Sequence, residues 1–333
     1  MTPSRCSAAR PLCSGGAVLP LGRGVRDDSE QMLRCASALL GRRGVIARQG
    51  RQVVGGVGLC CASGWVGGGA DPASGIFLTM ILQRVEQSEW LSNAYLAVDE
   101  IGGTGVLIDS NLATEPLCER VEREGTTITH ILLTHHHYDH VVGLDDLAER
   151  FGNVPVLAHP KCKELVGDAV TATIDHGDVL ETGDLRIEAI HTPGHCADHL
   201  ALRINDDDCL TADVVFKGTV GGTGAPGATG LGDLKASVMD RLMSLPNDVR
   251  LHPGHREPTT VIEEWENNPF IRLWRGLDEP TDERCTVGPR DENRRDATLL
   301  LWAPDYDGGN KALVRFDDDG VETITGGSQV RRV

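Results

Sequence analysis

The chain has 333 residues and a formal net charge of −17 at pH 7, which argues against binding to the phosphates of DNA or RNA. Its apolar runs all fall short of 18 residues, which excludes a membrane-spanning helix. The ten cysteines include no CxxC pair and we see no secretory signal, so reduced thiols in the cytoplasm are expected.

Residues 1–79 differ from the rest of the chain in composition. They contain nine Arg, no Lys and four acidic residues, and their Gly-rich runs lack the periodicity of a strand or helix. Three interpretations follow: a mis-assigned start with Met80 as the true first residue, a disordered extension, or a targeting peptide. We favour the first, because Met80 directly precedes the plausible first strand 81–86.

The following part of the chain alternates apolar runs with turn residues. Helices are expected at 114–124, with Pro116 in the first turn, and at about 142–151. Two more are expected after Asp233 as an N-cap and after Thr260, which opens a Thr-x-x-Glu capping box. Strands are expected at 81–86, 94–99, 105–109, 127–133, 154–158, 185–190, 199–205, 208–212 and 248–252. The sum is a two-sheet α/β layer structure.

One of these strands runs directly into the string THHHYDH, residues 134–140. A strand that ends in His-x-His places the two imidazoles, here His135 and His137, on the same side of the chain. The next turn presents Asp139 and His140. Imidazole and carboxylate ligands suit zinc, iron or manganese, whereas calcium prefers oxygen ligands alone.

Three further candidate ligands lie downstream, each where a strand gives way to a loop. His195 ends HTPGH, Asp213 ends LTAD, and His255 ends HPGH. Loops held on a rigid scaffold are where binding residues concentrate. The seven residues together predict a metal site.

The order HxHxDH, PGH, strand-end Asp, PGH resembles the metallo-β-lactamase superfamily over roughly residues 80–275. The similarity is greatest to the glyoxalase II-like (hydroxyacylglutathione hydrolase-like) hydrolases, which carry similar THHHxDH and HTPGH strings. The resemblance implies an αββα sandwich over 80–285. It also implies two divalent ions, with zinc the first expectation and iron or manganese the alternatives. One ion would be held by His135, His137 and His195, the other by Asp139, His140 and His255, with Asp213 as the bridge.

The resemblance further implies a reaction: hydrolysis of a thioester, or of an ester or lactone, by a hydroxide that bridges the two ions. Asp139 and Asp213 would be the catalytic carboxylates, with Asp139 also orienting the hydroxide. The partner would be a small-molecule substrate, with no nucleic acid and no membrane involved.

The remaining histidines receive other roles. His136 should point away from the ligands, and His191 and His252 are expected to orient them. His199 is left open, and Cys196 is interpreted as a small polar replacement rather than a ligand. Three more are interpreted as structural: His130, His159 and His176.

The loop 218–227 contains GTGAPG, a formal match to the dinucleotide-binding pattern GxGxxG. We set this match aside, because Pro226 interrupts it and no helix opens on the third glycine. The loop is expected to border the substrate cleft. Glyoxalase II-like proteins carry an Arg after the glycines, where this chain has Gly222 and Thr223, and this departure argues against glutathione recognition.

The C-terminal segment 286–333 is predicted to be a β-meander with strands at 298–302, 312–316 and 321–325. Glyoxalase II uses a helical C-terminal part to bind its glutathione thioester, so another acyl thioester, an ester or a lactone is the expected substrate here. Two alternatives stay open: a single-iron persulfide dioxygenase-like enzyme sharing His135, His137, His195 and Asp213, and a non-catalytic metal-binding module.

Overall fold

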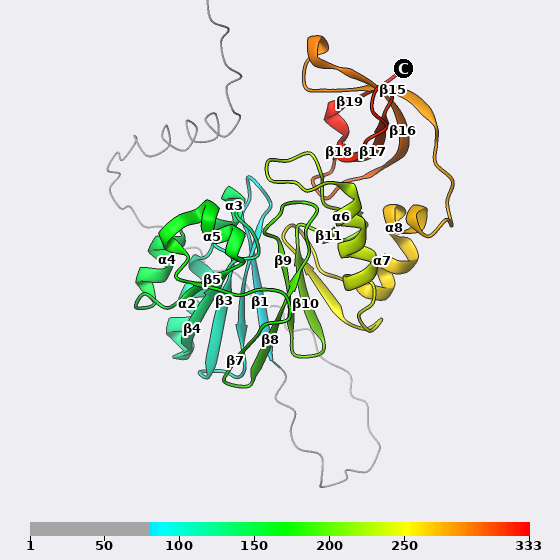
Figure 1. Cartoon of the computed structure of the whole chain (residues 1–333). Helices are drawn as coiled ribbons and strands as arrows, with labels where there is room; N and C mark the ends of the chain where they lie inside the picture. Colours follow the sequence, from blue (N-terminus) through cyan, green and yellow to red (C-terminus); the bar gives the residue numbers. More distant parts are fainter. Residues whose placement is uncertain (1–79) are drawn as a thin grey trace, which may run out of the picture. The chain divides into compact units, whose positions relative to one another are not determined.

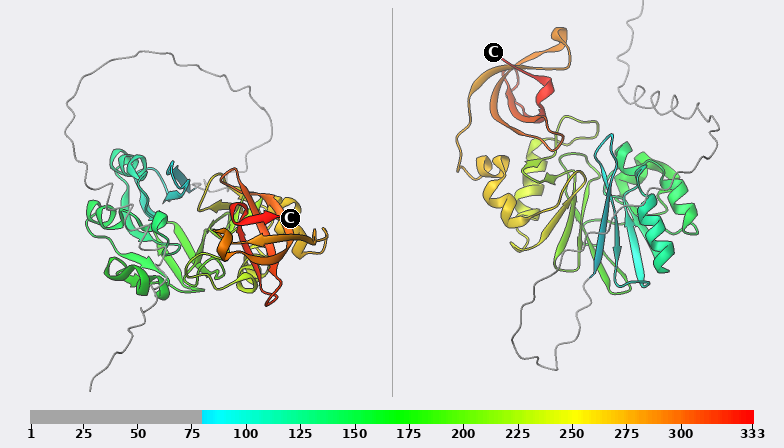
Figure 2. Two further views of the ribbon diagram at one scale, coloured as in Figure 1. Left: turned by 90° about the horizontal axis from the view of Figure 1, so that it is seen from above. Right: turned by 180° about the vertical axis from the view of Figure 1, so that it is seen from behind.

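The computed structural model describes residues 80–333, and the interpretations of residues 1–79 lie outside this range. Two six-stranded sheets pack face to face, and helices cover the outer face of each (Figures 1 and 2). The layers are therefore helix, sheet, sheet, helix, which confirms the expected αββα sandwich. Within the described residues no helix is long and apolar enough to cross a membrane.

The first sheet has the strand order β1-β2-β3-β4-β5-β6. Its first three strands pair antiparallel, and β3 to β6 pair parallel. The strands are β1 (Ile81–Glu86), β2 (Asn93–Val98), β3 (Thr104–Ile108), β4 (Thr127–Leu132), β5 (Val156–Ala158) and β6 (Ala172–Thr173). The helices on this half are α2 (Glu115–Glu124), α3 (Tyr138–Val141), α4 (Leu144–Arg150), α5 (Pro160–Val166) and the short η1 (Gly167–Ala169).

The second sheet has the order β14-β13-β10-β9-β8-β7, antiparallel except between β10 and β13. Its strands are β7 (Val179–Thr182), β8 (Leu185–His191), β9 (Leu200–Ile204), β10 (Asp208–Ala212), β13 (Arg250–Pro253) and β14 (Thr259–Thr260). The small hairpin β11 (Val215–Phe216) and β12 (Thr219–Val220) follows β10. The helices are α6 (Leu231–Ala236), its π-helical continuation η2 (Ser237–Leu242), α7 (Val261–Asn267) and α8 (Pro269–Trp274).

Strand β2 shows how the layers are held together. Leu96 belongs to the apolar cluster that includes Leu117 of α2, whereas Ala97 belongs to the cluster that includes Leu202 of the second sheet. Because side chains alternate along a strand, a strand buried on both faces contributes side chains to two apolar cores. This double burial explains why β2 has no exposed residue.

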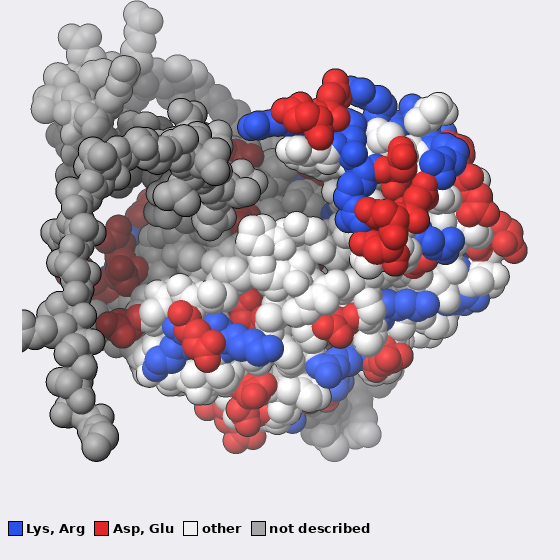
Figure 3. Space-filling view, turned by 45° about the horizontal axis from the view of Figure 1, so that its top comes forward, with Lys and Arg blue, Asp and Glu red and all other residues white. Residues whose placement is uncertain are grey.

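The C-terminal part forms a separate five-stranded antiparallel sheet with the order β18-β17-β16-β15-β19. It begins at Glu283, inside the range 80–285 expected for the sandwich. Its strands are β15 (Glu283–Val287), β16 (Arg295–Pro304), β17 (Asn310–Phe316), β18 (Glu322–Gly326) and β19 (Val330–Arg332), with the turns η3 (Asp291–Asn293) and η4 (Gly327–Gln329). Charged side chains of both signs crowd its surface (Figure 3).

The C-terminal sheet packs on the sandwich. Leu300, Leu313 and Ile324 join the apolar cluster that contains Leu234 and Phe270 of the outer helices. Thr223 extends this contact, because its N–H donates to the Ile324 carbonyl and its hydroxyl accepts from the Ile324 N–H, each at 2.9 Å. The C-terminal sheet thus contacts both the outer helices and the Gly-rich loop, residues 218–227.

One predicted helix start was wrong. Gly230, not Asp233, precedes the first residue of α6, and Asp233 lies within the first turn. Gly230 has φ of 108°, a conformation that favours glycine, so the chain turns into the helix there. Thr260, by contrast, caps α7 as predicted: its hydroxyl accepts from the Glu263 N–H at 3.2 Å.

Candidate metal centre

All seven predicted ligands lie on loops or short helices that follow strands of the two sheets. His135 and His137 follow β4, and Asp139 and His140 lie in α3. The other three follow strands of the second sheet: His195, Asp213 and His255. The structure brings these residues into two groups, within each of which the candidate ligand atoms lie within 4.8 Å of one another.

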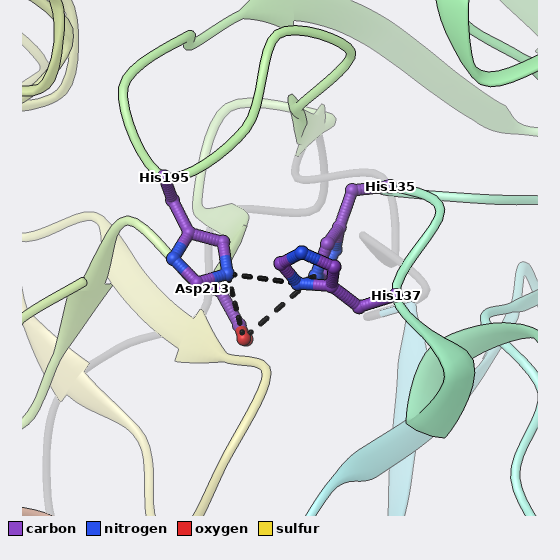
Figure 4. A group of neighbouring side chains, drawn as sticks. All are labelled: His135, His137, His195 and Asp213. Atoms are coloured by element: carbon purple, nitrogen blue, oxygen red, sulfur yellow. Dashed lines mark hydrogen bonds and ion pairs between the residues drawn. The ribbon is translucent and has the colours of Figure 1, made fainter. Parts of the chain in front are cut away.

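The first group consists of His135, His137, His195 and Asp213 (Figure 4). Nδ1 of His137 lies 3.0 Å from Nε2 of His135 and 3.0 Å from Nε2 of His195. Oδ2 of Asp213 lies 3.7 Å and 3.5 Å from the same two Nε2 atoms. Three ring nitrogens and one carboxylate oxygen thus converge on one point, a donor set that suits zinc or iron.

The protonation of these rings fits a role as ligands. Burial lowers the pKa of His135 and His137, and it lowers that of His195 to about 4. The three imidazoles are therefore neutral at pH 7, which is the form that binds a metal ion.

The second group consists of Asp139, His140 and His255. Oδ2 of Asp139 lies 3.6 Å from Nε2 of both histidines. Asp213 also reaches this group, with Oδ1 3.5 Å from His140 Nε2 and Oδ2 3.3 Å from His255 Nε2. Asp213 is therefore the carboxylate that the two groups share.

Two atoms of this centre are buried without a hydrogen-bond partner among the described residues, namely His140 Nε2 and Asp213 Oδ1. Buried polar atoms are nearly always paired, so both atoms fit a bound cation between them. Burial opposes protonation of His140, but the nearby carboxylates outweigh it and raise the pKa of His140 to about 10. This concentration of negative charge independently favours a cation at this position.

The ligands are oriented by a set of buried hydrogen bonds. Nδ1 of His140 bonds Oδ2 of Asp109 at 3.0 Å, and the N–H and hydroxyl of Thr134 both donate to Asp109 at 2.8 Å. Nδ1 of His195 donates to the Gly222 carbonyl at 3.0 Å, and Nδ1 of His255 to the Trp90 carbonyl at 2.9 Å. Each bond fixes which ring nitrogen is free for a metal.

His199, left open on the sequence, supports the bridging carboxylate. The N–H of Asp213 donates to Nε2 of His199 at 3.1 Å, and the other ring nitrogen of His199 bonds the Thr192 hydroxyl at 2.8 Å. Ala212, directly before Asp213, has φ of 39°, an unusual value for a non-glycine residue that marks local strain beside the site. A Cβ on Gly254 would lie 2.1 Å from Oδ1 of Asp213, so only glycine fits there.

The neighbouring polar residues do not belong to either group. His136 points away from the ligands and bonds Asp198 at 2.8 Å; with Cys196 they form a separate cluster. Burial raises the pKa of the Cys196 thiol, which keeps it protonated. His191 bonds the Ala197 carbonyl at 2.9 Å.

The predicted ligand-orienting role of His252 was wrong. Its Nε2 bonds Asp208 at 2.7 Å, at the start of β10 and not at a metal ligand. The histidines set aside as structural, His130, His159 and His176, are likewise absent from both ligand groups.

The Gly-rich loop borders the centre. Besides the Gly222 carbonyl on His195, the Pro226 carbonyl lies 3.3 Å from Nε2 of His137, and a Cβ on Gly227 would lie 3.0 Å from the His136 ring. Backbone carbonyls of this loop thus contact two of the candidate ligands, His195 and His137.

Sequence reasoning missed two residues at the centre, Asp109 and Tyr306. Asp109 directly follows β3 and has φ of 59°, and its position after a buried strand resembles that of the predicted ligands. Tyr306 comes from the C-terminal sheet, and its ring stacks on that of His255 with centroids 4.6 Å apart and an interplanar angle of 19°. Burial, together with the charge of Asp213, raises the pKa of Tyr306.

Comparisons with known proteins match the part of the chain that carries these residues. The model of the metallo-beta-lactamase superfamily matches residues 88–255, which include all seven predicted ligands. An uncharacterised protein of Aquifex aeolicus (strain VF5) is 32% identical over 208 residues, covering 57% of this chain and 97% of that protein. A hydroxyacylglutathione hydrolase of Bradyrhizobium sp. (strain ORS 278) is 34% identical over 170 residues, covering 51% of this chain but only 64% of that enzyme.

Several solved structures are also similar to this chain. A protein named TTHA1623, solved in a di-iron-bound form, is 31% identical with a TM-score of 0.50, and the match covers 56% of this chain and 99% of that one. ETHE1 from Myxococcus xanthus is 28% identical with a TM-score of 0.51, covering 61% and 93%. The B3 metallo-beta-lactamase BLEG-1 is 25% identical with a TM-score of 0.52, covering 57% and 99%.

Proposed function

Because this chain belongs to the metallo-beta-lactamase superfamily, we propose that it is a binuclear metallo-hydrolase that cleaves an acyl thioester. The observation that carries the proposal is Asp213, whose carboxylate oxygens lie 3.3–3.5 Å from histidine nitrogens in both groups of candidate ligands. One group alone would suit a single ion. Two groups joined by a carboxylate support a pair of ions close enough to act on one water molecule.

The donor set fits two divalent ions. His135, His137 and His195 would hold one, Asp139, His140 and His255 the other, and Asp213 would bridge them. When bound, the pair lowers the pKa of a water held between them and stabilises negative charge on a carbonyl oxygen. Zinc is the first expectation, and the similarity to a protein solved with two irons supports iron as the alternative.

The protein's own residues supply the positioning. Asp109 holds the His140 ring, the Gly222 and Trp90 carbonyls hold His195 and His255, and His199 holds the backbone of Asp213. Asp139, with its side chain 22% exposed, is more exposed than Asp213 at 8%, and its proposed role is to orient the attacking hydroxide. These fixed contacts mean that little reorganisation is needed during the reaction.

A thioester is the proposed substrate class because a thiol has an ordinary pKa of about 8.5 and leaves as the anion with little help from an acid. The similarity to a hydroxyacylglutathione hydrolase supports this class. Two features argue against glutathione as the thiol: Gly222 and Thr223 replace the Arg of that family, and Thr223 is bonded to Ile324.

The proposal is tested by elemental analysis of the purified protein together with a panel of thioester, lactone and phosphoester substrates. We expect two metal ions per chain and turnover confined to thioesters or lactones. One metal per chain with no hydrolysis across the panel would contradict the proposal.

A second candidate is a mononuclear-iron persulfide dioxygenase-like oxidoreductase, and the likeness to ETHE1 keeps it in consideration. It would use His135, His137, His195 and Asp213 and leave the second group as hydrogen-bonding partners. The unpartnered Nε2 of His140 favours the binuclear centre over this candidate.

A further inference from the structure

The β16–β17 hairpin carries its tip, residues 305–309, to the metal centre. Two cations fasten this tip to the sandwich. Nζ of Lys311 donates to the Val220 carbonyl at 2.8 Å and pairs with Asp305 at 3.0 Å, and Nε of Arg256 donates to the Tyr306 carbonyl at 3.3 Å. Lys311 is buried and its charge is paired, as a buried ammonium group requires. The tip is therefore docked in a defined position.

This docking places the ring of Tyr306 against a ligand of the second group. The ring stacks on His255, and its other contacts are Phe216, with centroids 4.6 Å apart, and the Lys311 ammonium group, 5.1 Å from the ring centroid. Tyr306 keeps intermediate exposure, so this residue is not sealed from solvent.

A second pair of aromatic residues, Trp90 and Tyr138, is linked to the second group through the backbone. The Trp90 carbonyl accepts the hydrogen bond from His255, and the Trp90 ring meets that of Tyr138 edge to face, with centroids 5.4 Å apart. Tyr138 is 42% exposed and directly precedes the ligand Asp139. Two members of the second group thus have an aromatic side chain next to them: Tyr306 stacks on His255, and Tyr138 directly precedes Asp139 in the sequence.

We propose that Tyr306 is a specificity-determining residue whose ring, with the Trp90–Tyr138 pair, binds an apolar and preferably aromatic group of the thioester. This inference rests on the proposed hydrolase function. Aromatic faces bind flat apolar groups by stacking and by burial of apolar area. The two cations at the tip are paired with Asp305 and with Glu86, so they offer little to an anionic thiol such as glutathione.

The test compares Tyr306→Ala and Tyr306→Phe with the full-length parent, each loaded with zinc. The substrates are the phenylacetyl and acetyl thioesters of N-acetylcysteamine, a small neutral thiol, and the ligands are their non-hydrolysable thioether analogues in calorimetry. We expect Tyr306→Ala to bind the phenyl analogue about tenfold more weakly and to show a similar rise in KM, with kcat within about twofold. Tyr306→Phe and the acetyl ligands should show no such change.

Val321→Ala is the matched control, because Val321 is an exposed apolar residue in another turn of the same sheet. Unchanged affinity of Tyr306→Ala for the phenyl analogue would overturn the inference, as would loss of a metal ion, which would assign Tyr306 to holding His255. If the alanine variant does not fold, Tyr306→Leu replaces it and is expected to lose the preference for phenyl over acetyl; a retained preference would overturn the inference. Absence of thioester turnover in the parent would contradict the proposed function alone, because the calorimetric binding measurements still test the role of Tyr306.

Discussion

At the scale of single residues, the carboxylate of Asp213 is the most demanding part of the site. It contacts four histidine rings, its N–H is held by His199, and it follows a residue with positive φ. Such strain persists only where the surrounding structure holds the chain firmly. The strained backbone at Ala212 therefore helps to place the Asp213 carboxylate between the two groups of candidate ligands.

Replacing Asp213 with Ala should abolish hydrolysis while the fold survives. Residues that merely orient metal ligands cost about 10–100-fold when mutated, so loss of the shared ligand should exceed about 100-fold in turnover and reduce the metal content of both groups. Asp240→Ala, at an exposed position, is the control. Circular dichroism, metal content and turnover are the measurements. A variant that kept two metals and near-normal turnover would show that Asp213 is not the bridge.

Replacing His255 with Ala separates the hydrolase from the dioxygenase. His255 belongs only to the second group, so a binuclear hydrolase should lose one metal and most of its rate. A mononuclear iron enzyme should keep its single metal and much of its rate. The exposed His176→Ala is the matched control. One retained iron with sustained oxygen uptake would decide for the dioxygenase.

The convergence of the seven candidate residues could be predicted because their signal is local: short strings of His, Asp, Pro and Gly at the ends of apolar runs. The positions of Asp109 and Tyr306 at the centre could not be predicted in this way. Both act through contacts between segments that are distant in the sequence. Asp109 bonds His140, 31 residues later, and Tyr306 of the C-terminal sheet stacks on His255 of the sandwich. His252 was misassigned for the same reason, because its partner Asp208 lies on a neighbouring strand.

At the scale of elements, the parallel pair β10–β13 matters most, since Asp213 and His255 follow these two strands. Asp208 joins the strands at their other end. Its carboxylate accepts from Arg250 Nε at 2.7 Å, from a second nitrogen of the same guanidinium at 2.6 Å and from His252 at 2.7 Å. Burial alone would raise the pKa of Asp208, but these bonds outweigh it and hold the pKa below its usual range.

Replacing Asp208 with Asn should destabilise the protein by about 1–3 kcal/mol at pH 7, because it removes a buried charge-assisted network whose Arg250 end is exposed to solvent. The folded-state pKa lies below the unfolded value of about 3.9, so this stabilisation is present above that pH and is lost as the pH falls through the folded value. Urea unfolding at several pH values measures it. Asp206→Asn, at a fully exposed neighbour, should change stability by less than about 0.5 kcal/mol. A gap between the parent and Asp208→Asn that stays constant down to pH 2 would contradict the assignment.

Most sandwich strands were predictable from apolar runs, because strands buried on both faces need continuous apolar sequence. Weaker elements escaped prediction. Strand β7 has no buried residue, and α5 buries only Cys162, so neither carries a strong pattern. Helix α6 was expected to start at Asp233 because an acidic cap is a common signal, but the unusual backbone of Gly230 sets the start earlier.

At the scale of the whole molecule, the first strand of residues 80–333 begins where the composition changes. Strand β1 starts at Ile81 and pairs along its full length with β2, and the family match begins at residue 88. Among the described residues, the sandwich therefore has its first edge strand directly after Met80.

A chain that begins at Met80 should fold and bind metal as well as the full-length chain. We expect the melting temperature to stay within about 3 °C, which corresponds to less than about 1 kcal/mol for a domain of this size. Metal content should be equal. Differential scanning calorimetry and elemental analysis of the two chains, prepared in parallel, are the measurements. A clear fall in either quantity would show that residues 1–79 contribute to the folded protein.

The docked hairpin also bears on how such a protein can diversify. The seven proposed metal ligands lie between residues 135 and 255, whereas the ring that stacks on His255 is contributed some fifty residues later by a different sheet. With the role proposed for Tyr306, changes in residues 305–309 would alter substrate preference while the proposed metal ligands keep their identities. Selection can act on the two parts separately, and an engineer could randomise this short turn alone to obtain new substrate ranges from an unchanged reaction centre.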